Sequence, residues 1–331
     1  MCSRLRALLA AGLFASACAS PPRPPREDDR VPVPPTHPLM KAVPTGAVSV
    51  LYIDYARLRT TWKEALAAGT SASELRQRQG FVESEDVDHA VLVAVDAWGE
   101  ENLGIYQGRF GEDALARSEI AAGRDLPAYR ERPLWGDSQR SLSLIQAGRV
   151  ALGPRAAVER AVDVAEGLGT SFVSAPWYRA SNQALTRAWP AGIPVALELL
   201  VEVTPQMQTR FASVFPEAAK LTWFALRAGG RDDLHVVAVG QAATEADARA
   251  VVFALAQRTE ALAMRPQLKV LGVSGVLEAL RYDVTGTKAH VGLEIGTDAW
   301  QTLERRFAQI LTFLQQRRQT QQDAAGARSG E

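Results

Sequence analysis

The stretch LRYDVTGTKAHVGLEIGTDAWQTLERRFAQIL, residues 280–311, shows both kinds of element from which the fold is built. Its first part alternates apolar with polar side chains, and the apolar positions are Tyr282, Val284, Ala289, Val291, Leu293 and Ile295. This period of two predicts a hairpin with one buried face. The spacing then becomes helical, with a stripe at Trp300, Leu303, Phe307, Ile310 and, just beyond the stretch, Leu314. We therefore expect a hairpin followed by a helix that covers a sheet.

The same order of elements occurs earlier in the chain. Residues 141–165, SLSLIQAGRVALGPRAAVERAVDVA, again predict a hairpin and a helix. Residues 46–58 and 192–208 each predict a strand that runs into a helix, and 88–117 and 221–249 each predict two strands and the start of a helix. Matched segments in the same order indicate an internal repeat.

These patterns predict an α+β fold with two similar halves, each a mostly antiparallel sheet covered on one face by helices. The first α+β module is expected over residues 39–170 and the second over 171–316. The order of elements, with phrases such as GRVALGPRAAVERAVD (148–163), resembles secreted bacterial proteins of uncharacterised function built from a duplicated sheet-and-helix module. That resemblance implies neither a reaction nor a ligand.

The N-terminal residues predict an export signal. Residues 1–17, MCSRLRALLAAGLFASA, place two arginines before a short apolar run, as in a signal peptide. The run is shorter than the roughly 20 apolar residues that span a bilayer. ASAC, ending at Cys18, resembles a bacterial lipobox, although Ala15 stands where leucine is usual. The alternative is an ordinary signal peptide cleaved near Ala19.

The lipobox resemblance implies acylation of Cys18, with palmitate among the acyl chains, and a lipid anchor in the membrane. Because Ala19 rather than aspartate follows, it also implies an outer-membrane lipoprotein, which we expect to face the periplasm. Residues 18–38 carry the lipidated cysteine and a proline-rich tether, and 317–331 form a polar tail that we expect to be disordered. The other cysteine, Cys2, lies in the segment to be removed, so no disulfide or thiolate chemistry is expected.

The composition argues against several classes of function. Lysine and arginine balance aspartate and glutamate at 37 each, which argues against a nucleic-acid partner. The phosphate-loop, dinucleotide, zinc-protease and nucleophile-elbow motifs are all missing from the sequence. The four histidines do not stand at metal-ligand spacings, and we expect surface positions for them. We therefore predict no cofactor, no metal site and no catalytic residue.

A few residues are candidates for binding. Trp177 and Trp189 flank the join between the halves and could line an apolar groove, although packing is the usual role of tryptophan. Glu198 and Glu202 lie four apart on one strand and project from the same face. They could contact a cation or a basic partner, but a solvated sheet face is the interpretation we favour. Asp54 ends a strand and aligns with Thr204, so we predict a helix cap.

Two functions agree with these observations. The first is a membrane-anchored lipoprotein whose folded part is a non-catalytic binding or scaffolding module for another envelope protein. The second is a binder of a small or lipidic ligand in a cleft between the halves. A large dry cavity near Trp177 and Trp189 would favour the ligand, whereas an exposed apolar strip would favour a protein partner.

Overall fold

A computed structural model describes residues 36–61, 72–95, 102–122, 125–270, 272–303 and 305–306. The expected signal peptide, Cys18, most of the tether and the tail over 317–331 lie outside these residues, as do Phe307, Ile310 and Leu314 of the predicted stripe. No helix of the described ranges is both long enough and apolar enough to cross a membrane.

The strands are β1 (Ser49–Asp54), β2 (Val87–Ala94), β3 (Asn102–Gly108), β4 (Asp125–Tyr129), β5 (Arg132–Gly136), β6 (Ser141–Gln146), β7 (Arg149–Gly153), β8 (Val195–Glu202), β9 (Leu221–Gly229), β10 (Leu234–Ala242), β11 (Arg281–Thr285) and β12 (Lys288–Ile295). The α-helices are α2 (Tyr55–Thr61), α4 (Ala72–Gln79), α5 (Glu83–Asp86), α6 (Glu112–Ala116), α7 (Arg155–Ala165), α8 (Pro176–Ala188), α9 (Pro205–Val214), α10 (Glu245–Ala263), α11 (Pro266–Val270) and α12 (Ser274–Glu278). Short 3₁₀ helices are η2 (Pro38–Ala42), η3 (Phe172–Ser174) and η4 (Ala218–Lys220), and residues 297–303 and 305–306 are also helical.

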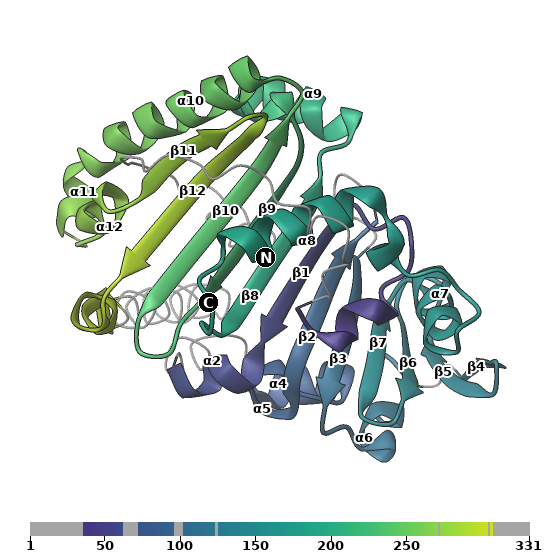
Figure 1. The fold of residues 1–331 in the computed structure, drawn as a ribbon. Coiled ribbons are helices and arrows are strands. Elements are labelled where there is room, and N and C mark those ends of the chain that lie inside the picture. The colour runs from purple at the N-terminus through teal and green to yellow at the C-terminus, as the bar shows by residue number, and fades with distance from the viewer. Residues whose placement is uncertain are drawn as a thin grey trace, which may run out of the picture.

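All the strands join one 12-stranded sheet, in the order β11-β12-β10-β9-β8-β1-β2-β3-β7-β6-β5-β4 (Figure 1). Every pairing in it is antiparallel. The predicted α+β class with antiparallel sheets is therefore confirmed. The sheets of the two halves are joined at the centre, where β1 pairs with β8 and Tyr52 lies opposite Glu198.

Counted outward from the centre, both halves have the same strand order. The first half runs β1-β2-β3-β7-β6 and the second runs β8-β9-β10-β12-β11, while the first half adds the hairpin β5-β4 at its edge. The turns of the matched hairpins each hold a glycine at positive φ, Gly148 at 68° and Gly286 at 56°. Side chains other than glycine rarely adopt this conformation. The shared order is what a repeat requires, and descent by duplication stays a prediction.

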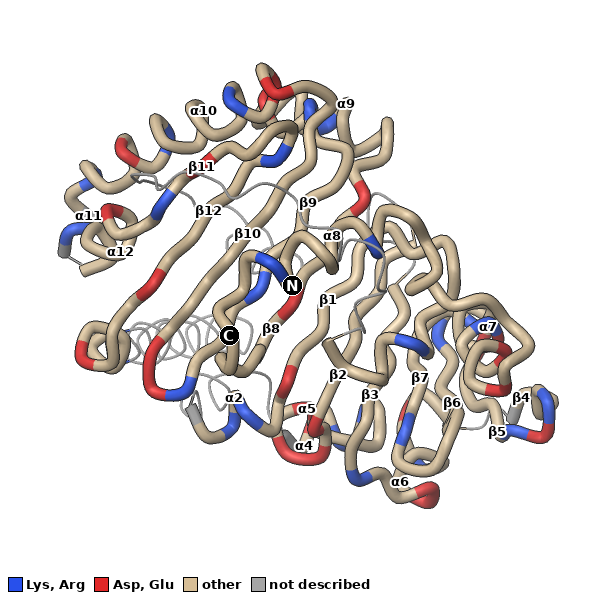
Figure 2. The backbone as a smooth tube through the Cα atoms, in the orientation of Figure 1, with Lys and Arg blue, Asp and Glu red and all other residues tan. Residues whose placement is uncertain are grey.

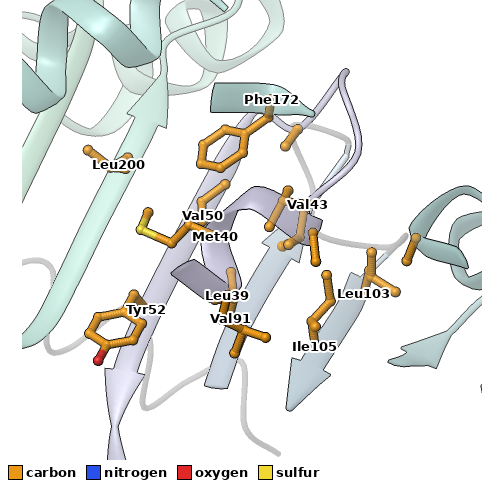
Figure 3. Packing of buried hydrophobic residues seen from close by; sticks show 14 of the residues in the cluster. Leu39, Met40, Val43, Val50, Tyr52, Val91, Leu103, Ile105, Phe172 and Leu200 are labelled. Carbon is orange, nitrogen blue, oxygen red and sulfur yellow. The ribbon is translucent and has the colours of Figure 1, made fainter. Parts of the chain in front are cut away.

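Helices cover both faces of the sheet. We call the face with Val50 and Tyr52 the η2 face, because their cluster of buried residues includes Leu39 and Met40 of η2 (Figure 3). That cluster also takes in side chains of α7 and α8 and reaches Leu200, Ala225 and Val239 in the second half. The opposite face, here called the α10 face, carries two separate clusters, one with α10 over the second half and one with α6 over the first.

The last hairpin has the one buried face that its sequence predicts. Ala289, Val291, Leu293 and Ile295 are buried on the α10 face, together with Trp300 and Leu303 of the helical segment that follows. On the η2 face of this hairpin, Arg281, Asp283 and Thr285 are exposed. The edge of the second half therefore presents polar side chains on this face, and Figure 2 shows residues of both charges on β11.

Candidate functional site

The most unusual group at the centre of the sheet is a buried ion pair. Glu198 of β8 is completely buried, and Arg227, its register partner on β9, is only 5% exposed. Arg227 Nε donates to Glu198 Oε2, so the two charges are in direct contact. Our expectation of a solvated sheet face is therefore wrong for Glu198, because α8 and the N-terminal segment lie over this strand.

Side chains from three other places complete the group. Arg227 Nη2 donates to Asn182 Oδ1 of α8 at 2.6 Å and to Thr36 Oγ1 at 3.0 Å. Its Nη1 donates to Thr186 Oγ1 at 3.0 Å, and Thr36 Oγ1 donates to Glu198 Oε2 at 2.5 Å. A buried pair is tolerated when further hydrogen bonds satisfy its remaining polar atoms, and this pair has several. Thr36 thus connects the start of the described chain to the core.

Two polar atoms beside this pair have no hydrogen-bond partner within the described part of the chain. They are Glu198 Oε1 and Tyr178 Oη of α8, and Tyr178 is only 2% exposed. Burial, and next the nearby Glu198 carboxylate, raise the pKa of Tyr178 above its ordinary range. The tyrosine therefore stays neutral near pH 7.

Glu202 lies on the same face as Glu198, opposite Trp223, as the strand period predicts. It is only partly exposed, and burial raises its pKa. The two carboxylates therefore have different surroundings: Glu198 has a buried counter-ion, whereas desolvation dominates at Glu202.

A second group lies where the N-terminal segment crosses β1 and β2. The His37 ring stacks on His89 with centroids 4.1 Å apart and on Tyr52 at 5.4 Å. Tyr52 Oη and His89 Nδ1 are 3.1 Å apart, and Leu39 N donates to His37 Nδ1. Burial, and then the nearby His89, lower the pKa of His37 to about 4. The predicted surface positions are wrong for this stacked pair and for His235, which is buried beside Asp233.

Asp54 has the capping role that the internal alignment predicts. Its Oδ1 accepts a hydrogen bond from Arg57 N at 2.9 Å, at the start of α2. Thr204 Oγ1 likewise accepts a hydrogen bond from Met207 N at 3.4 Å, at the start of α9. Both side chains satisfy backbone N–H groups that a helix start leaves unpaired.

Trp177 and Trp189 lie at opposite ends of α8. They are 12 residues apart, which corresponds to roughly 18 Å along a helix. Trp177 packs against the cluster on the η2 face, and Trp189 Nε1 donates to Ile193 O at 2.9 Å. The structure does not bring the two side chains together, and each has a packing or hydrogen-bonding role.

The α10 face has an apolar feature that the sequence patterns do not predict. Leu92, Leu51, Leu199 and Leu226 lie in register on the four adjacent strands β2, β1, β8 and β9. Ile53 and Leu197 form a second cross-strand pair beside them, and all six side chains are half-buried. We call these residues the central row. Leu51, Ile53, Leu197 and Leu199 belong to none of the three buried clusters of the described ranges.

Sequence could have revealed only part of these groups. The alternating strand pattern VALELLVE places Leu197 and Leu199 on the face of β8 that does not carry Glu198. Their neighbours on that face depend on the pairing of β8 with β1 and β9. Arg227 is the lone charge in the apolar strand LTWFALRAG, which marks it as a residue that needs a partner. Across the described ranges, no group of three or more His, Cys, Asp or Glu side chains could hold a metal ion.

Comparison with known proteins gives similarity to solved structures alone. No family model matches the chain, and no curated protein does. Three crystal forms of a protein called TP0453 are similar in structure. Form I has 8% identity and a TM-score of 0.46, covering 81% of this chain and 96% of that one. Form III has 9% identity and a TM-score of 0.47, covering 81% of this chain and 97% of that one. Form IV has 10% identity and a TM-score of 0.47, covering 80% of this chain and 96% of that one.

Proposed function

We propose that this chain is a lipid-anchored protein of the bacterial cell envelope, held at the outer membrane through Cys18 and facing the periplasm. Its folded part binds another envelope protein and does not catalyse a reaction. The proposal for the anchor is based on the order of basic, apolar and small residues that ends at Cys18. Thr36, the first residue of the described chain, is hydrogen-bonded to Glu198 and Arg227 at the centre of the sheet. A force on the tether would therefore be transmitted to the sheet centre.

The observation that carries the binding role is the central row. Six half-buried aliphatic side chains on adjacent strands form one apolar strip, and we take this strip to be the surface that contacts the partner. A strip across neighbouring strands suits an apolar protein surface better than a small molecule enclosed in a cleft. A lipidic ligand is the alternative, since acyl chains also match such a strip.

The polar groups support a non-catalytic role. Asp54 caps a helix, and Glu198 neutralises a buried arginine, so both carboxylates already have structural partners. General acid–base catalysis needs a group with reach to a substrate and a pKa near the working pH. We therefore predict that the purified chain is inactive in broad hydrolase assays.

The anchor and the binding surface can be tested separately in cells. Mass spectrometry of the mature protein should find an acylated Cys18 at the N-terminus, and Cys18→Ser should release the protein from membranes. For binding, a photo-crosslinking amino acid at Leu199 should form adducts with an envelope protein. The same probe at Thr285, exposed on the η2 face of β11, should not.

Each outcome of the crosslinking has a defined meaning. Protein adducts at Leu199 and not at Thr285 support the proposal. Lipid adducts at Leu199 would show that the central row binds a lipidic ligand and not a protein partner. Equal labelling at Leu199 and Thr285, or no intermolecular adduct at either position, would show that the central row is not a binding surface.

A further inference from the structure

The N-terminal segment of the described chain crosses the η2 face, and we call residues 36–45 the strap. Leu39 and Val43 are completely buried in the apolar cluster of that face (Figure 3). Thr45 N donates to Thr170 O at 2.9 Å, which fixes the far end of the strap. The later part of the strap is therefore held by apolar burial and by a backbone hydrogen bond.

The first two residues of the strap are held differently. Thr36 Oγ1 is hydrogen-bonded to both Glu198 and Arg227, and the His37 ring stacks on His89. Both residues are only partly buried. Segments that bury little apolar surface open locally at a lower cost in free energy than a packed core does. The start of the strap can therefore open while the sheet stays folded.

The His37 ring caps the strap only while its Nδ1 carries no proton. This nitrogen accepts a hydrogen bond from Leu39 N at 3.1 Å, at the start of the 3₁₀ helix η2. The neutral ring therefore carries its proton on Nε2. A protonated imidazole has an N–H at both ring nitrogens and cannot accept this bond. Protonation of His37 therefore breaks the cap.

The titratable and charged groups near the His37 ring come from three strands, and they are Asp54 and Tyr52 of β1, His89 of β2 and Arg149 of β7. Burial, and next His89, oppose a charge on His37, and Arg149 adds to their effect, whereas the Asp54 carboxylate favours the charge. Tyr52 stays neutral, because burial raises its pKa. The pKa of His37 is lowered from 6.5 to about 4 as a result.

The other charged groups of the described elements around the strap are paired or exposed. The pairs are Glu198–Arg227 beside Thr36, and Arg155–Glu159 and Arg130–Asp163 at α7, which packs against η2. Lys41 and Arg160 are exposed, so water screens their charges. His37 is therefore the residue of the strap that takes up a proton between about pH 6.5 and pH 4.

We infer that the start of the strap is an acid-sensitive latch, in which proton uptake by the His37 ring releases Thr36 and His37 from the sheet while the rest of the fold stays in place. Release of Thr36 removes a hydrogen bond from each member of the Glu198–Arg227 pair and lets water reach it. The open latch binds one more proton than the closed latch. The ratio of open to closed should therefore rise by up to about tenfold per pH unit as the pH falls from 6.5 to about 4.

Hydrogen exchange of the full chain, followed residue by residue by NMR from pH 6.5 to pH 4, tests the latch. The readout is the protection of the Leu39 and Met40 amides, which donate to His37 Nδ1 and His37 O. Division by the rates of an unstructured peptide of the same sequence removes the intrinsic effect of pH. We expect the protection to fall by about tenfold or more over this range. At each pH, these amides should exchange faster than the core amides of β10 and β12, because only the strap opens.

The matched variant is His37→Asn, because asparagine can still cap η2 but takes up no proton. Its Leu39 protection should not change with pH. His290→Gln removes a histidine of β12 whose pKa is also lowered by burial, and it should leave the fall at Leu39 as in the parent chain. Constant protection of Leu39 in the parent chain, or an equal fall in His37→Asn, would overturn the inference. So would exchange at Leu39 no faster than in β10 and β12, because the whole fold would then be opening.

A second variant tests the link between the latch and the ion pair. Thr36→Val removes the hydroxyl that is bonded to Glu198 and Arg227, so the Leu39 protection at pH 6.5 should fall by about threefold to tenfold. The dependence of this protection on pH should keep its slope. Unchanged protection in a Thr36→Val chain that is folded by circular dichroism would contradict the joint release of Thr36 and His37. These measurements require neither the lipid anchor nor a partner, so the latch and the proposed function can fail separately.

Discussion

The two halves of the sheet share a strand order and differ in the face that their terminal helices cover. In the first half, α7 follows β7 and packs on the η2 face through Ala157, Val158 and Ala161. In the second half, the helical segment after β12 packs on the α10 face through Trp300 and Leu303. The same series of strands thus leads to opposite placements of the last helix.

The strand residues beneath explain this difference. On the η2 face, the first-half hairpin carries Ser143, Ile145 and Ala151, all buried. The second-half hairpin carries charged side chains on that face, including Arg281 and Asp283, which are exposed. A helix with an apolar stripe is stable on the first surface and not on the second. The strand order alone therefore does not decide which face a helix covers, whereas the polarity of each strand face does.

The centre of the sheet shows a second difference between the halves. The offset of 150 residues that aligns Asp54 with Thr204 also aligns Val48 with Glu198. Val48 precedes β1 and bonds to Ala94 O, so its cross-strand neighbour is Val95. An apolar pair in the first half therefore corresponds to the Glu198–Arg227 ion pair in the second.

The largest effect is expected from breaking this ion pair. Arg227→Met leaves the Glu198 carboxylate buried without a counter-ion, which costs about 3–5 kcal/mol when one partner of a buried pair is lost. The free energy of unfolding, measured by urea denaturation, should fall by that amount. The control is Arg281→Met, at an exposed position of β11, which should change the free energy of unfolding by less than about 0.5 kcal/mol.

The double variant Glu198→Met with Arg227→Met makes the second half resemble the first. Because apolar residues often replace a buried pair at little cost, this variant should be more stable than Arg227→Met alone. A loss from Arg227→Met below about 1 kcal/mol, or a double variant less stable than the single one, would show that the halves do not differ in this way.

The next effect concerns acid sensitivity at the η2 face. His37 has a folded pKa of about 4, below its ordinary value of 6.5, because it is partly buried and lies beside His89. The unfolded chain then binds more protons than the folded chain between these two values, so stability is lost as the pH falls from about 6.5 to about 4. The nearby Asp54 carboxylate raises the pKa of His37 and so opposes this shift, whereas the Arg149 guanidinium lowers it further. Tyr52, which stacks on His37, has a raised pKa and stays neutral over this pH range.

His37→Asn removes this titration but keeps a side chain that can cap η2. After allowance for solvent screening, the variant should reduce the stability difference between pH 7 and pH 4 by about 1–2 kcal/mol. In the second half, burial also lowers the pKa of His290, so His290→Gln should reduce the same difference. Urea denaturation of the full chain at both pH values measures each effect. An unchanged pH dependence in His37→Asn would exclude the stacked pair as a source of acid sensitivity.

Strand and helix patterns were predictable from sequence, whereas contacts across strands were not. The alternation in 281–295 and the caps at Asp54 and Thr204 are local, and each was predicted from neighbouring residues. The burial of Glu198 was missed because it depends on Thr36, more than 160 positions away along the chain, and on the register with β9. The central row was missed for the same reason, since its members come from four strands.

The smallest effects compare the two matched helix caps. Asp54→Ala should lower the free energy of unfolding by about 1 kcal/mol, the usual contribution of an N-cap side chain. Thr204→Ala should cost less, about 0.5 kcal/mol, because its bond to Met207 N is 3.4 Å long, against 2.9 Å for Asp54 to Arg57 N. Asp54→Asn retains a capping oxygen and should change stability only slightly. Urea denaturation of the three variants gives the order. If Asp54→Asn cost as much as Asp54→Ala, the carboxylate charge would matter through Arg57 and His89, at 3.6 and 3.8 Å, and the two caps would not be equivalent.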